Sequence, residues 1–232
     1  METQIVNLLM SMGALDCGFA DFSATAATPE PKLNKAPLPT AIAFVIALSD
    51  AIIDEIADAP THSYFHHYRT VNYRIDQMLL SLGFLLAQNG FRYIPIPASQ
   101  SIPTNELPFS GRFPHKAAAV AAGLGDIGRN CLFLHRTAGC RVRLGTMFTD
   151  WLPASFPTST EGLRLSAQCA DCTKCVDACP ARALIGLNST AANRDNLLIP
   201  ERCSQHMKSA YRDIGRGSVC GICMRVCPAG RR

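Results

Sequence analysis

The sequences CADCTKCVDACP, residues 169–180, and CGICMRVCP, residues 220–228, determine the character of this 232-residue chain. The first follows the pattern C-x2-C-x2-C-x3-C-P, and the second follows C-x2-C-x3-C-P. A [4Fe–4S] cluster needs four thiolates, and runs of this kind are typical of ferredoxin-type proteins that hold two such clusters. The C-terminal part of the chain is therefore predicted to carry electrons through two iron–sulfur clusters.

The spacing also predicts which thiols share a cluster. In two-cluster ferredoxins, the fourth cysteine of a run ligates the other cluster. Cys227 should therefore complete the first cluster and Cys179 the second. One corner of the second cluster is left, and Cys203, 17 positions before Cys220, is the natural candidate. The predicted ligands are thus Cys169, Cys172, Cys175 and Cys227 for the first cluster, and Cys179, Cys203, Cys220 and Cys223 for the second.

Two other uses of the cysteines fit less well. Zinc sites need only four ligands each, and usually pair one C-x2-C with a distant C-x2-C or with histidines. A disulfide framework needs a secreted protein, whereas the N-terminal METQIVNLLMSMGALDCGFAD shows no basic segment or clear cleavage site. Reduced thiols and oxygen-labile clusters predict a cytoplasmic protein. The remaining cysteines, Cys17, Cys131 and Cys140, are predicted to be small buried side chains.

Composition limits the function classes. A hydrophobic content of 48% and a charged content of 17% suit a globular protein, and a net charge of +4 does not indicate a nucleic-acid surface. The longest apolar run, residues 41–48, is far too short to span a bilayer. Because the cluster motifs need only about 65 residues, a domain of about 150 residues precedes them. We expect domains at residues 1–155 and 160–232.

Helical and strand-like patterns mix upstream of the cysteines without regular βαβ repetition, which predicts an α+β domain followed by a ferredoxin-like module. The best helix covers residues 70–89, where apolar positions follow one face. Other helices are expected at residues 1–20 and 115–122, and a short helix or loop at 51–58. Strands are expected at 41–48, 91–97, 132–135 and 141–149. Connecting segments are expected at 29–39, 99–114 and 153–160.

The glycine segment at residues 123–128 matches G-x-G-x-x-G. A dinucleotide fingerprint needs a strand before the glycines and a helix after them, whereas here a helical run precedes and a strand-like run follows. The pattern therefore disfavours NAD(P). The glycines instead let the backbone approach something large and flat, or they form a helix C-cap and a tight turn.

At this point the chain shows a resemblance. HKAAAVAAGLGDIGRNCLFLHRTAGCRVRLGTMFTD (residues 115–150), together with the two cysteine motifs, resembles the epoxyqueuosine reductase and reductive dehalogenase superfamily. YFHHYRTVN and GFRYIPIPAS, farther upstream, are similar to its shorter members. The resemblance implies a nitroreductase-like domain that binds cobalamin or another corrinoid. It also implies that a ferredoxin or flavodoxin supplies electrons, which pass through both clusters to the corrinoid and drive a reductive cleavage.

The resemblance also implies a set of corrinoid-binding residues. These are Gly123, Gly125, Gly128, Asn130, Arg141, Arg143 and Gly145, with His115 and Lys116 as further candidates for a contact to a corrinoid amide or phosphate. A surface pair is the alternative for the last two.

A reduction needs protons as well as electrons. The segment from Tyr64 to Arg69 gathers titratable side chains in an otherwise apolar chain. Tyr64, His67 and Tyr68 are therefore candidate proton donors, and Arg69 could orient an anion. The alternative is a loop with a helix cap, whose side chains are hydrogen-bonded or solvated.

Three departures shape the expected function. Epoxyqueuosine reductases carry a carboxylate in a motif resembling V-D-x-x-P, whereas the matching GRFPHKAAA has none. The tRNA-binding extension of longer members and the twin-arginine signal of respiratory dehalogenases are also not visible. We expect a compact, cytosolic iron–sulfur reductase with an unassigned small substrate and no membrane partner, and we find no direct evidence in the sequence for tRNA binding. The alternative is an electron-transfer or activator protein that reduces a partner's corrinoid and has no substrate of its own.

Overall fold

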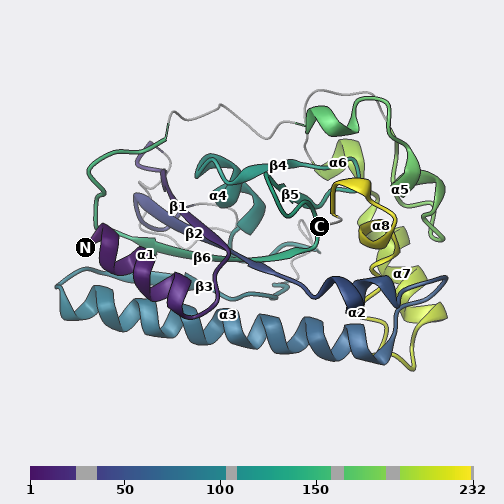
Figure 1. Ribbon diagram of the computed structural model, residues 1–232, viewed down its shortest axis with the longest axis horizontal. Coiled ribbons are helices and arrows are strands. Elements are labelled where there is room, and N and C mark those ends of the chain that lie inside the picture. Colours follow the sequence, from purple (N-terminus) through teal and green to yellow (C-terminus); the bar gives the residue numbers. More distant parts are fainter. Residues whose placement is uncertain (25–35, 103–108, 158–164, 187–193, 231–232) are drawn as a thin grey trace. The chain divides into compact units, whose positions relative to one another are not determined.

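The computed structural model describes residues 1–24, 36–102, 109–157, 165–186 and 194–230 (Figure 1). The predicted connecting segments at 29–39, 99–114 and 153–160 lie partly outside these residues. The chain divides into two compact units that alternate along the sequence. The first comprises Met1–Ile46, Val71–Leu124 and Arg143–Glu161, and the second comprises Ala47–Thr70, Gly125–Val142 and Gly162–Arg232. The division into domains at residues 1–155 and 160–232, expected from the sequence, stays a prediction beside these two compact units.

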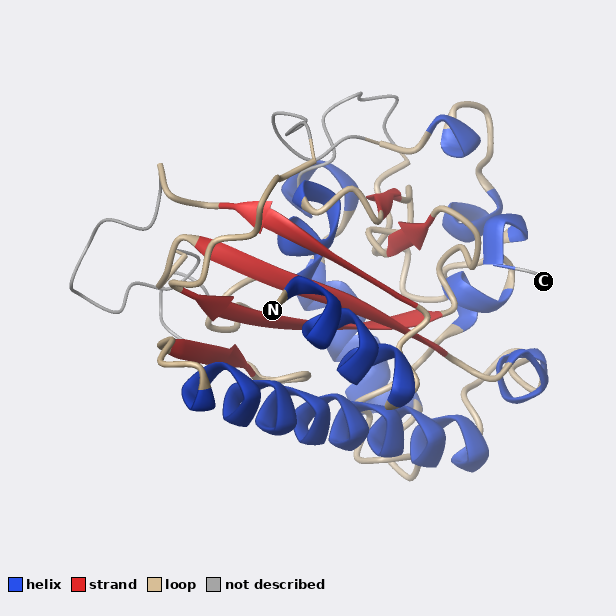
Figure 2. Ribbon diagram, turned by 60° about the vertical axis from the view of Figure 1, so that its left-hand side comes forward, coloured by secondary structure: helices blue, strands red, loops and turns tan. Residues whose placement is uncertain are grey.

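A four-stranded sheet forms the centre of the first unit (Figure 2). Its order is β1 (Asp16–Asp21), β2 (Thr40–Ala47), β6 (Val142–Thr149) and β3 (Tyr93–Ile96). β1 pairs antiparallel with β2, and β3 pairs antiparallel with β6. All residues of β2 except the last are buried, which explains its continuous apolar sequence. Strand β1 was not predicted, because DCGFAD combines glycine with two aspartates and lacks a strand pattern.

The predicted helices of the first unit are confirmed with changed limits. α1 (Glu2–Ser11) buries Ile5 and Leu9. It runs alongside α3 (His62–Gln88) in Figures 1 and 2, and the Arg74 guanidinium of α3 donates to the Met12 carbonyl at 2.9 Å. α4 (His115–Ala121) packs on β1. The apolar face predicted for α3 is buried at Val71, Ile75, Met78, Leu79, Leu82 and Leu86.

α3 begins eight residues before the predicted start, so the segment from Tyr64 to Arg69 is helical rather than a loop. The Tyr64 peptide N–H donates to the Thr61 hydroxyl at 3.0 Å, which satisfies one of the free amides of the first turn. The periodic apolar pattern starts only at Val71, and this is why the sequence suggested a later start.

Short elements build the second unit. β4 (Gly125–Ile127) and β5 (Phe133–His135) form an antiparallel hairpin, and α2 (Asp50–Asp54) contacts α8 (Ile222–Arg225). The cysteine-rich region adds the 3-10 helix η1 (Ala167–Cys169), α5 (Lys174–Asp177), α6 (Arg194–Leu197), α7 (Pro200–Ala210) and the 3-10 helix η2 (Pro228–Gly230). Among the described residues, no helix is both long and apolar enough to cross a membrane.

Candidate iron–sulfur site

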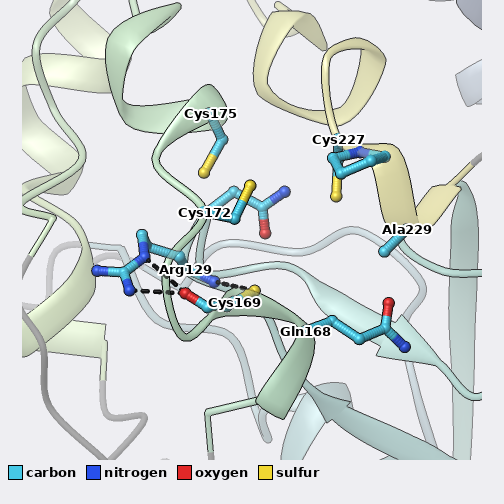
Figure 3. Close-up of a pocket in the computed structure, with 9 residues that line it drawn as sticks. Arg129, Gln168, Cys169, Cys172, Cys175, Cys227 and Ala229 are labelled. Carbon is cyan, nitrogen blue, oxygen red and sulfur yellow. Dashed lines mark hydrogen bonds between the residues drawn. The ribbon is translucent and has the colours of Figure 1, made fainter.

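Four thiols from the two cysteine motifs line one cavity in the second unit. Cys169, Cys172, Cys175 and Cys227 surround a volume of about 190 Å³, together with side chains that include Arg129 and Gln168. Figure 3 shows the first three on the segment around η1 and α5, and the fourth on the segment that follows α8. The fold therefore brings a cysteine of the second motif to the three leading cysteines of the first.

The donor set suits a cluster better than a single ion. Within the described ranges, no three side chains of His, Cys, Asp or Glu converge closely enough to hold one metal ion. Four cysteines on the rim of a cavity are instead the ligand set of a [4Fe–4S] cluster. Such a cluster would be held by the four thiols named above, and it would supply one-electron redox chemistry.

The other four cysteines of the predicted set also lie near one another in the second unit. Burial raises the pKa of the Cys203 thiol to about 11, and the nearby Cys220 and Cys179 add to the effect. The pKa of Cys223 is raised by burial and then by Cys220, Cys203, Cys175 and Cys179. Thiolates at these positions would repel one another. A bound metal centre would stabilise the deprotonated form of these thiols.

The turn between β4 and β5 contacts both cysteine motifs. The Arg129 peptide N–H donates to the Cys169 sulfur at 3.4 Å, and the side-chain amide of Asn130 donates to the Cys223 carbonyl at 3.3 Å. Cys131 ends this turn with a positive φ of 59°. These contacts could not be predicted from the sequence, because the bonded residues are 40 positions apart in one case and 93 in the other.

Cys140 is a second feature that the sequence did not reveal. Its side chain is buried as predicted, but its thiol donates to the Met224 carbonyl at 3.6 Å and also interacts with Cys227. The interaction with the Cys140 side chain lowers the pKa of Cys227, an effect that outweighs burial and is assisted by the Ala229 and Gly230 peptides. A thiol outside both motifs thus stabilises the thiolate form of a predicted ligand.

Arg141, a predicted corrinoid-binding residue, is engaged within the second unit. Its side chain is 1% exposed, and its guanidinium pairs with Asp50 at 3.0 Å and Asp54 at 2.8 Å, both on α2. Asp54 also lies 3.7 Å from Arg225 of α8. Arg141 therefore holds α2 by two ion pairs, and α2 in turn contacts α8, the helix that contains Cys223.

Arg143 and His115 are engaged within the first unit. The Arg143 guanidinium donates to the Asn72 side chain at 2.9 Å and to the Ala98 carbonyl at 3.2 Å. The two ring nitrogens of His115 lie 2.9 Å from the Thr146 hydroxyl and 3.0 Å from the Pro97 carbonyl. Lys116 is half-buried next to it on α4. Both nitrogens of His115 are thus used inside the protein.

The His115 ring predicts a pH-dependent stability. Burial lowers the pKa of His115 to about 4, assisted by Arg143 and opposed by the Pro97 carbonyl and Asp76. An unfolded histidine has a pKa of about 6.5, so the unfolded chain binds this proton more readily. Stability from this group is therefore complete above pH 6.5 and falls between pH 6.5 and 4, by at most about 3 kcal/mol.

Thermal unfolding of the anaerobically reconstituted protein at pH 7 and pH 5 would measure this effect. His115→Gln retains hydrogen-bonding groups without titrating, so its Tm should change less than the wild-type Tm over that interval. An equal change in both proteins would show that other groups cause the loss.

Each glycine of the segment 123–128 has a packing role. Gly123, at φ +71°, follows α4, where the Leu124 amide donates to Ala119 and the Gly123 amide to Val120. These bonds form a Schellman motif, so the alternative of a helix C-cap is confirmed. A Cβ at Gly125 would overlap the Leu134 carbonyl, one at Gly128 would lie 2.6 Å from the Asn130 side-chain oxygen, and one at Gly145 would overlap the Phe44 ring.

The candidate proton donors share one face of α3, because Tyr64, His67 and Tyr68 are spaced three and four residues apart on the helix. Tyr64 is buried, and its ring would lie 2.9 Å from a Cβ at Gly221, between Cys220 and Cys223. His67 Nε2 accepts the Ser49 amide at 3.0 Å, and burial followed by the neighbouring His66 lowers the pKa of His67. Tyr68 is half-buried with its ring 6.2 Å from Tyr64, whereas Arg69 is exposed and stacks on Phe65.

The predicted corrinoid-binding residues are shared between the units. His115, Lys116, Gly123, Arg143 and Gly145 belong to the first unit, while Gly125, Gly128, Asn130 and Arg141 belong to the second, as do the candidate proton donors and all eight predicted cluster ligands.

Comparison with known proteins agrees with this geometry. Residues 168–230 match a family described as the 4Fe-4S double cluster binding domain. An epoxyqueuosine reductase of Cyclobacterium marinum is 32% identical over 123 residues, which cover 49% of this chain and 36% of that protein. A tetrachloroethene reductive dehalogenase of Dehalobacter restrictus is 33% identical over 121 residues, which cover 47% and 21%. The chain thus spans about a third or less of the length of these curated relatives.

Solved structures show the same fold. The catabolic reductive dehalogenase NpRdhA superposes with a TM-score of 0.72 and 21% identity, over 98% of this chain and 31% of that one. A selenomethionine-labelled epoxyqueuosine reductase gives a TM-score of 0.60 and 20% identity, over 99% and 65%. This chain therefore has a mixed α/β fold like that of these structures, and it is related to epoxyqueuosine reductases and reductive dehalogenases.

Proposed function

We propose that the protein is an oxidoreductase in which the eight cysteines hold two [4Fe–4S] clusters. The carrying observation is the cavity lined by Cys169, Cys172, Cys175 and Cys227, because it unites thiols of both motifs in the way that cross-ligation requires. The second cluster would be bound by Cys179, Cys203, Cys220 and Cys223. Since the thiols must stay reduced, the cytoplasm is the proposed location.

The proposed final acceptor is a cobalamin or another corrinoid, used for reductive cleavage of a small substrate. Two observations support this step. A relative is a tetrachloroethene reductive dehalogenase, and a structure described as suggesting a mechanism for B12-dependent dehalogenation superposes over 98% of this chain with a TM-score of 0.69. We assign a nitroreductase-like corrinoid-binding role to the first unit, whose sheet and helices match the expected α+β pattern. A corrinoid bound by the glycine segment would be held mainly by backbone groups, because Arg141, Arg143 and His115 use their polar atoms elsewhere.

Tyr68 is the proposed proton donor of the titratable segment. Tyr64 is buried against Gly221, and His67 already accepts a peptide hydrogen bond. Tyr68 is half-buried and keeps part of its surface in solvent. Arg69 is exposed on another face of α3, where it could orient an anion.

The proposed electron donor is a ferredoxin or flavodoxin that docks near the second cluster. The four thiols of the second set are half-buried, whereas three of the first set are buried. Exposed basic side chains occupy the segment that carries the second set, and would attract an acidic protein. They are Arg182, Arg202, Lys208, Arg212 and Arg216.

One observation favours the alternative, an electron-transfer or activator protein without its own substrate. The glycines and most polar residues expected at a corrinoid are already accounted for by contacts within the protein. In that case the electrons would leave for a corrinoid bound by another protein.

Anaerobic reconstitution with iron and sulfide, followed by addition of cobalamin, separates the two functions. We expect about eight irons per chain, a 1:1 cobalamin complex by gel filtration, and reduction of the bound corrinoid when reduced ferredoxin is added. The rate of that reduction should fall as ionic strength rises. Eight irons without cobalamin binding would leave the electron carrier, and fewer than about six irons would contradict the two-cluster proposal itself.

A further inference from the structure

Arg129 occupies an unusual position next to the first set of thiols. It lies in the turn between β4 and β5, and it is 2% exposed. Its peptide N–H donates to the Cys169 sulfur at 3.4 Å. Its guanidinium donates to the Cys169 carbonyl at 2.7 Å, as Figure 3 shows, and to the carbonyls of Ala170 at 3.0 Å and Gly186 at 2.9 Å. A cationic side chain is thus held beside a predicted cluster ligand by three backbone carbonyls.

This position has a direct consequence for electron affinity. Reduction adds one negative charge to an iron–sulfur cluster, and the potential depends on nearby charge, on hydrogen bonds to the sulfurs and on solvent exposure. A buried positive charge is weakly screened, so it stabilises the reduced form more than a surface charge would. The peptide N–H bond to the Cys169 sulfur acts in the same direction. Arg129 should therefore raise the reduction potential of the cluster that Cys169 ligates.

The contacts of the second set are of another kind. The Cys179 sulfur accepts the neutral Ala183 peptide N–H at 3.4 Å, and the neutral Asn130 amide donates to the Cys223 carbonyl at 3.3 Å. Arg182 and Arg202, on the segment that carries this set, are exposed. A buried cation thus adjoins the first set, whereas solvent screens these cations of the second segment.

We propose that Arg129 raises the potential of the first cluster above that of the second, so that the first cluster is the electron acceptor of the second. This rests on the proposed function, in which the eight cysteines hold two clusters. One electron leaves the second cluster and one electron reduces the first, without bond formation or proton transfer. The external donor, a reduced ferredoxin or flavodoxin, then restores the second cluster.

Redox titration of the reconstituted full chain, followed by EPR, tests the proposal. Cys203→Ser should remove the EPR signal of the second cluster and Cys172→Ser that of the first, so these variants show which signal belongs to which cluster. In Arg129→Gln we expect the ratio of reduced to oxidised first cluster, measured at the wild-type midpoint, to fall at least tenfold, which corresponds to about 59 mV for one electron. Arg129→Lys keeps the charge and should change that ratio less than about threefold. Arg136→Gln removes the same charge from an exposed position of the second unit and should change neither cluster.

A second measurement uses partial reduction. With one electron added per chain, the wild-type signal should come from the first cluster, whereas in Arg129→Gln part of it should move to the second. An unchanged first-cluster potential, an equal shift in both clusters, or equal shifts in the Gln and Lys variants would overturn the proposal. Loss of the first cluster from Arg129→Gln but not from Arg129→Lys would also overturn the proposal, because Arg129 would then be required for cluster assembly.

A third variant decides the matter if neither substitution retains the first cluster. Gln168 lines the same cavity and is exposed, so Gln168→Lys adds a cation without disturbing the buried arginine. It should raise the reduced fraction of the first cluster alone, and no change would overturn the proposal. The iron content of the wild type reports separately on the two-cluster function.

Discussion

Cys227→Ser is expected to remove the cluster that Cys169, Cys172 and Cys175 share with it, although Cys227 belongs to the other motif. The thiol lines the same cavity as those three, and a serine hydroxyl is a much poorer ligand than a thiolate. Iron should therefore fall from about eight to about four per chain after anaerobic reconstitution. Cys179→Ser should likewise remove only the second cluster.

Paired substitutions reveal which thiols share a cluster. Cys172→Ser combined with Cys227→Ser should leave the same four irons, approximately, as either change alone, because both remove one cluster. Cys223→Ser combined with Cys227→Ser should leave almost none. The opposite pattern would show that each motif binds its own cluster. Cys17→Ser is the matched control, since Cys17 lies in β1 of the first unit, and this variant should retain the wild-type iron content.

Gly139→Ala is expected to destabilise the second unit strongly. Gly139 has a φ of +59°, and a Cβ there would overlap the Ala229 carbonyl and lie 2.7 Å from the Gly230 Cα. Ala229 follows Cys227 by two residues and lines the cavity of the first set of thiols. Backbone strain and steric overlap together should cost about 3 kcal/mol, which for a chain of this size lowers Tm by roughly 6–12 °C. The first cluster should also be lost more readily.

Gly90→Ala provides the matched control. Gly90 has a φ of +81°, but a Cβ there would meet no atom within 4 Å. Only the conformational strain remains, at about 1 kcal/mol, and the iron content should not change. If the two alanine variants lowered Tm equally and kept both clusters, the packing of Gly139 against the turn after Cys227 would not matter for stability.

Strong local patterns were predicted correctly. The apolar run that forms β2, the periodic face of α3 and the alanine-rich α4 each carry their own signal, because buried strands and amphipathic helices repeat with fixed periods. Weak segments were not predicted. β1 forms because β2 offers it a full antiparallel register from Asp16 to Asp21, and β4 is only three residues long.

For the candidate site, too, some features could be predicted from the sequence and others could not. The cysteine spacing led to the set of four thiols that the structure brings to one cavity. The contacts of Arg129 and Cys140 with this set could not be predicted, because they join residues 40 and 84 positions apart. His115 and Arg141 were assigned to a cofactor from a resemblance, whereas their polar atoms bond to Thr146 and Pro97 in one case and to Asp50 and Asp54 in the other.

The sequence by itself determined that the chain carries a double-cluster module, because four-thiolate coordination demands particular residues at particular short spacings. Only the tertiary structure decided what surrounds those thiols. Hydrogen bonds to sulfur, buried charge and solvent exposure depend on chain segments that meet after folding, and the turn that carries Arg129 and Asn130 is one of them. Because such surroundings set cluster potentials, the direction of electron flow that we propose would depend on the fold rather than on the motif.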